Sequence, residues 1–121
     1  MKKILLVDDA GYLIKAYADN LKLGGFKEIR LAYDGKEALE KILEDKPDVI
    51  LTDIDMPVMD GYELCKRIRE NPNISDIYII ASSGRDLPEG MENYVDEILP
   101  KGNVEELLGR LKEILGGKKN E

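Results

Sequence analysis

Acidic residues that could bind a metal ion follow two apolar runs of this chain. Asp8 and Asp9 come directly after the run at residues 4–7, and Asp53 ends a second run at residues 49–52. Open α/β sheets keep their sites at the carboxyl ends of their strands, so we expect these three side chains to gather there. Neighbouring carboxylates repel one another, so they need a cation or raised pKa values. Mg²⁺ is the cation that suits hard oxygen ligands, and the pattern predicts a Mg²⁺ site.

The composition argues against several other classes of site and protein. The chain has 121 residues, 43% of them apolar, which indicates one domain with a substantial core. No apolar run approaches the roughly 18 residues of a membrane span. The net charge of -7 argues against nucleic-acid binding, and the absence of histidine removes His-based catalysis and His metal ligands. A single cysteine, Cys65, cannot form an internal disulfide, and without an export signal we expect a cytoplasmic protein.

Apolar runs alternate with amphipathic segments along the whole chain. Strands are predicted at residues 4–8, 29–33, 48–53, 77–81 and 98–99. Helices are predicted at residues 10–23, around 38–43, around 62–68 and from 104 to 115. The strand runs are too apolar for a sheet with one solvated face, which favours an α/β fold with a parallel sheet and helices on both faces. Residues 29–33 alternate in part, as expected of an edge strand.

The stretch from Ser83 to Val95 has the weakest pattern. Leu87, Met91 and Tyr94 have the spacing of a short helix, but proline and glycine lie between them. We therefore expect a short or irregular fourth helix there. The domain is expected to cover residues 1–115, and residues 116–121 to form a C-terminal tail.

Five short motifs occur in an order and spacing typical of one family. They are LVDD at 6–9, DGKEAL at 34–39, DIDMPVMDG at 53–61, AS at 81–82 and LPK at 99–101. Over nearly its whole length the chain resembles the receiver domains of two-component response regulators, the CheY-like family. The resemblance implies a flavodoxin-like, doubly wound five-stranded parallel sheet with strand order 2-1-3-4-5, in agreement with an edge strand at residues 29–33.

The resemblance also implies the roles of individual residues. Asp53 matches the phosphoacceptor, whose carboxylate forms an aspartyl phosphate. Lys101 would bring a positive charge to the phosphoryl group, and Ser82 a hydroxyl. The neighbouring Ser83 is the alternative for this hydroxyl.

The implied metal ligands surround the acceptor. Asp8 and Asp9 match the acid pair that holds Mg²⁺, with Asp9 the direct ligand. Asp53 itself and the backbone carbonyl of Asp55 complete the set that the resemblance implies.

The resemblance predicts a signalling switch rather than an enzyme with its own substrate. It would take a phosphoryl group from a sensor histidine kinase or a histidine phosphotransfer protein in a Mg²⁺-dependent reaction, then change its binding to a downstream partner that the sequence does not identify. It would catalyse only its own phosphorylation and dephosphorylation. One alternative is a docking receiver that never carries phosphate. Another is a haloacid-dehalogenase-like phosphatase, because Asp53-Ile54-Asp55 mimics the Asp-x-Asp motif of those enzymes.

The chain departs from the family pattern near its end. Lys101 is followed by Gly102 where the family usually has proline, Ile98 replaces the usual aromatic residue, and residues 82–101 form a shorter stretch than usual. We predict a trans Lys101-Gly102 bond, because a cis bond before a residue other than proline costs about 2.5–4 kcal/mol. Positive φ at this glycine would supply another backbone path for the lysine. Asn103 should then cap the last helix together with Glu106.

Overall fold

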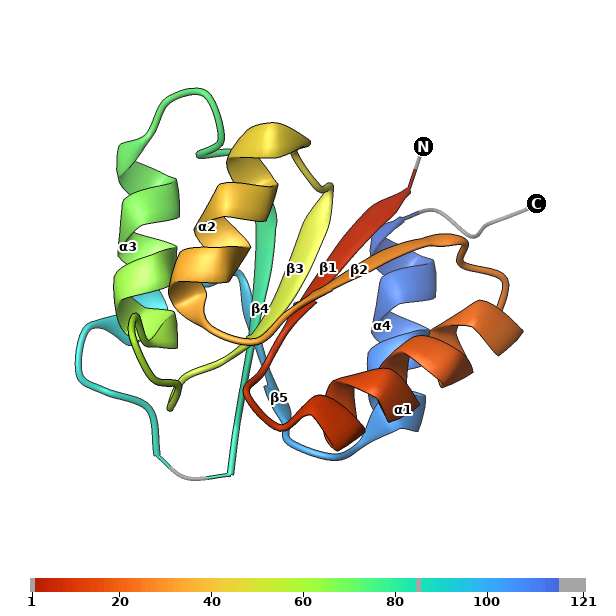
Figure 1. Ribbon diagram of the computed structural model, residues 1–121. Coiled ribbons are helices and arrows are strands. Elements are labelled where there is room, and N and C mark those ends of the chain that lie inside the picture. The colour runs from red at the N-terminus through yellow and green to blue at the C-terminus, as the bar shows by residue number, and fades with distance from the viewer. Residues whose placement is uncertain (1, 85, 116–121) are drawn as a thin grey trace.

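The sheet has five parallel strands in the order β2-β1-β3-β4-β5 (Figure 1). The computed structural model describes residues 2–84 and 86–115. The strands are β1 (Lys3–Val7), β2 (Glu28–Ala32), β3 (Val49–Asp53), β4 (Tyr78–Ser83) and β5 (Glu97–Pro100). The fold class, the strand order and the edge position of β2 predicted from the sequence are confirmed.

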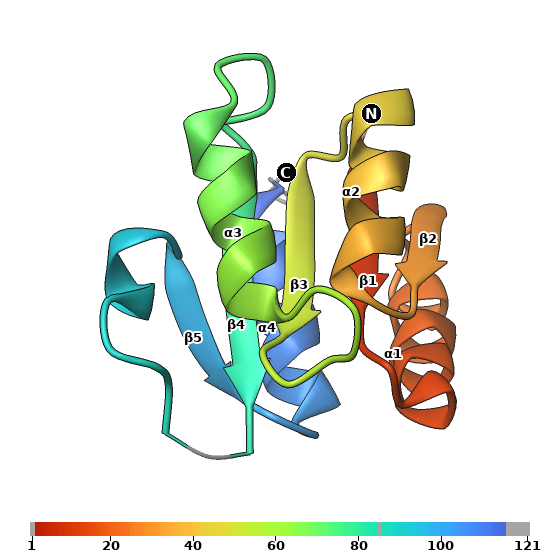
Figure 2. The same cartoon turned by 60° about the vertical axis from the view of Figure 1, so that its left-hand side comes forward.

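Helices cover both faces of the sheet (Figure 2). They are α1 (Gly11–Leu23), α2 (Gly35–Glu44), α3 (Gly61–Glu70) and α4 (Val104–Ile114). The buried apolar side chains of α2 and α3 belong to the core on one face, and those of α1 and α4 to the core on the other. Every residue of β3 is buried, as expected of a strand covered on both sides. Each predicted helix is present, although Leu43 of α2 is exposed rather than part of its packed face.

The connection between β4 and β5 is irregular, as predicted. Among its described residues, the helical part is one 3-10 turn, η1 (Met91–Asn93). Met91 is fully buried and anchors this turn in the core beside α3. The ring of Tyr94 meets Tyr62 of α3 edge-on, with centroids 5.6 Å apart. The connection is thus packed against α3 although it forms no regular helix.

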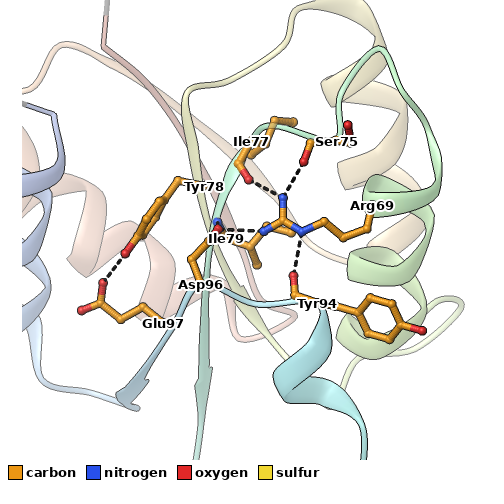
Figure 3. A network of polar contacts seen from close by, with 8 residues as sticks. All are labelled: Arg69, Ser75, Ile77, Tyr78, Ile79, Tyr94, Asp96 and Glu97. Atoms are coloured by element: carbon orange, nitrogen blue, oxygen red, sulfur yellow. Dashed lines mark hydrogen bonds and ion pairs between the residues drawn. The ribbon is translucent and has the colours of Figure 1, made fainter.

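A polar network around Arg69 holds the same region in place (Figure 3). The guanidinium at the end of α3 donates to Asp96 Oδ2 at 2.7 Å. It also donates to three backbone carbonyls, those of Ser75, Ile77 and Tyr94. Asp96 Oδ2 accepts a further bond of 2.8 Å from the Ile79 amide of β4. One side chain therefore ties α3 to the segments on both sides of β4.

The turn between β5 and α4 has the backbone predicted from the sequence. No cis peptide bond occurs at residues 2–84 or 86–115, so the Lys101-Gly102 bond is trans. Gly102 adopts a φ of 92°, which glycine tolerates without strain. Asn103 Oδ1 accepts from the Glu106 amide at 3.0 Å and caps α4. The trans bond, the positive φ and the Asn103 cap are confirmed, while the Glu106 carboxylate accepts from the Asn103 side-chain amide at 3.4 Å rather than from its backbone amide as in a capping box.

The predicted tail, residues 116–121, lies outside the described residues. Across the described ranges, no helix is long and apolar enough to cross a membrane.

Candidate functional site

Three carboxylates meet where β1 and β3 end. One oxygen each from Asp8, Asp9 and Asp53 lies within 4.8 Å of the others, in the part of the chain that the structure describes. β1 and β3 are neighbours in register, with Val7 opposite Thr52, so the acids that follow them share one edge of the sheet. This is the lower edge in Figure 2, where the carboxyl ends of the strands lie. The clustering that the sequence predicted is present.

Asp53 is buried at the centre of this group. Its Oδ1 accepts from the backbone amide of Ile54 at 2.8 Å. Its Oδ2 lies 3.0 Å from Lys101 Nζ. The backbone thus orients one carboxylate oxygen, and the other faces a positive charge.

Asp8 is also buried and shares the same lysine. Its Oδ1 accepts from the Ala10 amide at 2.8 Å, and its Oδ2 lies 3.2 Å from Lys101 Nζ. Burial, above all, raises the pKa of Asp8, and the nearby charge of Asp53 raises it further. The Ala10 amide and Lys101 act in the opposite direction. Asp8 is therefore a carboxylate whose ionised form the fold disfavours when no metal is bound.

Lys101 reaches the acids from the turn after β5. Its partial burial acts to lower its pKa, but hydrogen bonding and charge from Asp53 and Asp8 prevail and raise it. Its charge is shared between the two buried acids, while Asp9 is exposed to water. With three carboxylates and one ammonium, the cluster keeps a net negative charge that a cation can neutralise.

Ser82 lies beside the acceptor on the neighbouring strand. It is the register partner of Asp53 in the β3–β4 ladder, and it is buried. Its Oγ finds no hydrogen-bond partner within the described part of the chain. A buried hydroxyl without a partner carries a free-energy penalty, which a ligand oxygen could relieve.

The loop from β3 to α3 returns tightly over the strand end. A Cβ on Gly61 would lie 2.2 Å from the Asp53 carbonyl oxygen, so only glycine allows α3 to start this close to the acid. Val58 has a φ of 69°, inside a turn in which the Met59 amide donates to the Pro57 carbonyl at 2.7 Å. A β-branched residue at positive φ is strained, and such strain clusters at functional sites. The exposed Asp55 lies in this loop.

The donor set fits a Mg²⁺ ion. Mg²⁺ prefers oxygen ligands, binds through one or two carboxylates and keeps several waters. Buried Asp8 and Asp53 supply carboxylates fixed by the fold, and Asp9 adds a carboxylate on the exposed side, where waters can complete the shell. Cys65, a softer ligand, is buried in α3, and burial raises the pKa of its thiol to about 12. It therefore acts as a core residue.

Sequence reasoning missed one residue next to this site, Tyr17. The helical spacing of Leu13, Tyr17 and Leu21 predicts only a place on the apolar face of α1, and the ring of Tyr17 is buried there. Its hydroxyl oxygen, however, accepts from the Gly102 amide at 2.7 Å. The two residues are 85 positions apart, so no local pattern could have revealed the contact.

Comparison with known proteins points to one family. The family model described as "Response regulator receiver domain" matches residues 4–112. The response regulator MprA of Mycobacterium ulcerans is 36% identical over 118 residues, covering 93% of this chain and 50% of that protein. MprA of Mycobacterium tuberculosis is 35% identical with the same coverage. The chain thus spans about half the length of the curated relatives it matches.

Solved structures agree with this assignment. A CheY-like response regulator receiver domain protein from Methanospirillum hungatei superposes with a TM-score of 0.84 at 28% identity, covering 95% of this chain and 94% of the other. The response regulator TrrA of Thermotoga maritima, solved in complex with Mg²⁺-BeF, has a TM-score of 0.83 at 31% identity, covering 94% and 99%.

Proposed function

Because the chain belongs to the response regulator receiver domain family of two-component signalling, we propose that it is a phosphorylation switch whose acceptor is Asp53. The observation that carries the proposal is the position of Asp53 Oδ2, 3.0 Å from Lys101 Nζ within a cluster of acid oxygens that fits Mg²⁺. The phosphoryl donor would be a sensor histidine kinase or a histidine phosphotransfer protein. Phosphorylation would change the affinity of the domain for a downstream protein.

In the proposed reaction an Asp53 carboxylate oxygen attacks the phosphorus atom. A bond from this oxygen to phosphorus forms, while the bond from phosphorus to the donor breaks and the donor keeps the electron pair. The Ile54 amide, 2.8 Å from Asp53 Oδ1, holds the carboxylate in one orientation. Asp8, Asp9, Asp53 and the Asp55 carbonyl would hold a Mg²⁺ ion. When bound, the ion would supply positive charge to the phosphoryl oxygens.

Lys101 and Ser82 would interact with the transferred group. The ammonium of Lys101 already faces the acceptor, so it can turn to a phosphoryl oxygen as negative charge arrives there. The unpartnered Oγ of Ser82 can donate to another phosphoryl oxygen. The phosphoryl group would thus satisfy a hydroxyl that finds no partner among residues 2–84 and 86–115.

The comparisons favour neither alternative raised by the sequence. The matched family is that of response regulators, not of phosphatases, and the acids, the lysine and the serine all lie at one strand edge. The motif Asp53-Ile54-Asp55 therefore supports a receiver and not an independent phosphatase.

Incubation with Mg²⁺ and acetyl phosphate, followed by intact mass measurement, tests the proposal. Wild-type protein should gain one phosphoryl group, lost on treatment with hydroxylamine as expected of an acyl phosphate. Asp53→Asn should gain none, since the amide is not nucleophilic. Asp48→Asn is the matched control, because Asp48 precedes β3 at the opposite end of the strand. Labelling that persists in Asp53→Asn, or a label on Ser82, would refute the assignment.

A further inference from the structure

We infer that Tyr17 is a positioning residue for Lys101: its buried hydroxyl holds the backbone that carries the lysine, an inference that rests on the proposed phosphorylation of Asp53. Tyr17 lies in the middle of α1 and is 4% exposed. Its ring belongs to the same core cluster as Leu99 of β5 and Leu107 of α4. Helix α1 and the two elements that flank the Lys101 turn therefore contribute to one core cluster.

The hydrogen bond acts on the peptide group that joins Lys101 to Gly102. Tyr17 Oη accepts from the Gly102 amide at 2.7 Å. A peptide group is planar, so this amide lies in one plane with the Cα atom of Lys101. Restraining the direction of the N–H bond therefore restrains the peptide group that carries the Cα atom of Lys101.

The turn is also held by the Asn103 cap and by the ion pairs of Lys101, but no side chain packs against Gly102 where a Cβ would lie. Gly102 is exposed, and a Cβ placed there would meet nothing within 4 Å. The residue is held at a φ of 92° in a position where glycine has many other conformations. The turn residues 101–103 and the first two residues of α4 also border an open hollow of about 460 Å³. A hydrogen bond from a rigid ring is the kind of restraint that such a backbone needs.

Lys101 needs accurate placement because its ammonium contacts two acids at once. Its Nζ lies 3.0 Å from Asp53 Oδ2 and 3.2 Å from Asp8 Oδ2. In group-transfer sites a misplacement of about 1 Å can cost on the order of a hundredfold in rate. Release of the turn from Tyr17 would let the lysine sample positions that reach only one acid or neither.

The test is a double-mutant cycle on the rate of labelling by acetyl phosphate at saturating Mg²⁺. Tyr17→Phe removes the hydroxyl and keeps the ring, and it should slow labelling roughly tenfold. In a Lys101→Ala background the same substitution should leave the rate unchanged, because no lysine remains to be positioned. Tyr12→Phe is the matched control: Tyr12 is on the same helix but 82% exposed, and its hydroxyl change should have no effect.

A second readout does not depend on phosphorylation. In metal-free protein, the nitrogen NMR signal of the Lys101 ammonium should move in Tyr17→Phe toward that of an exposed lysine. Urea unfolding verifies that each variant is folded. If Tyr17→Phe is not folded, Tyr17→Leu, which also lacks the hydroxyl, replaces it in the test. A wild-type rate and an unmoved signal in folded Tyr17→Phe would overturn the inference. So would an equal slowing in the Lys101→Ala background. Wild-type protein that is never labelled would instead refute the proposed function, while the NMR result would still decide the role of Tyr17.

Discussion

The Arg69 network and the acidic site both join separate strands through charged groups, but they differ in how completely those groups are paired. The Nε atom and both terminal nitrogens of Arg69 donate to oxygens of the described chain, and Asp96 forms an ion pair with the guanidinium (Figure 3). At the acidic site one ammonium pairs with two of three clustered carboxylates, and the neighbouring Ser82 Oγ has no partner among the described residues. A network that satisfies its own groups stabilises the fold. A cluster that leaves charge and a buried hydroxyl unsatisfied retains the capacity to bind a ligand.

The largest effect on stability is expected at the Arg69 network. Arg69→Met keeps the aliphatic stem but removes the Arg69 donor from three carbonyls and from Asp96, which keeps the bond from the Ile79 amide. We expect a loss of about 2–4 kcal/mol in the free energy of unfolding, measured by urea denaturation. The rate of labelling of the folded variant should not change.

Lys46→Met provides the control for Arg69→Met. Lys46 forms an exposed ion pair with Asp76, and such pairs contribute about 0–1 kcal/mol. Equal losses in the two variants would show that the Arg69 network is no more structural than an ordinary surface pair.

The next prediction distinguishes the acidic site from the Arg69 network by how Mg²⁺ changes the stability of variants in each. At a Mg²⁺ concentration ten times the dissociation constant, the ion should stabilise wild-type protein by about 1.4 kcal/mol. Asp9→Asn should lose most of this gain and Asp8→Asn less of it, because Asp9 is the proposed direct ligand. Arg69→Met should keep the gain in full. Identical Mg²⁺ responses in wild type and both aspartate variants would remove the proposed metal site.

Asp8→Asn should raise the stability of the metal-free protein. Repulsion between carboxylates about 4 Å apart is of order 4 kcal/mol at an effective dielectric near 20, and Lys101 offsets most of it. The asparagine oxygen can still accept from the Ala10 amide, as Asp8 Oδ1 does. We expect a net gain of about 1 kcal/mol in urea unfolding with chelator present. A loss of stability would mean that Asp8 is a structural group like Asp96.

The smallest predicted effect concerns pH. Glu97 of β5 bonds to Arg110 and to the Tyr78 hydroxyl, and the Arg110 hydrogen bond above all lowers its pKa. An acid whose pKa is lowered by folding stabilises the protein at a pH above its pKa in the unfolded state. This contribution is lost as the pH falls through its pKa in the folded state. Wild-type protein should therefore lose stability relative to Glu97→Gln as the pH is lowered below the usual glutamate range. Urea unfolding at a series of pH values measures this difference. A difference between the two proteins that stays constant down to pH 3 would contradict the prediction.

Local patterns predicted the elements and the position of the acids, because they depend on neighbours in the chain. The alternation of apolar runs and helical stripes places the strands and helices close to their observed ends. The acids follow β1 and end β3, so a parallel sheet brings them to one edge whatever the details of packing. The turn after Lys101 was equally accessible, since a trans bond, a glycine at positive φ and an asparagine cap are local properties.

Only the tertiary structure decided which side chains meet across the fold and which remain exposed. Arg69 finds Tyr94 and Asp96 more than twenty positions away, and Tyr17 finds Gly102 after 85. From sequence alone Tyr17 is one more residue on an apolar face. Ile98 is predicted as a strand residue, but only the structure shows that its side chain is 51% exposed, on the edge strand β5. Periodicity reports only which face of an element a residue occupies. The partner of a polar atom depends on how elements distant in sequence pack, and that is determined when the whole core forms.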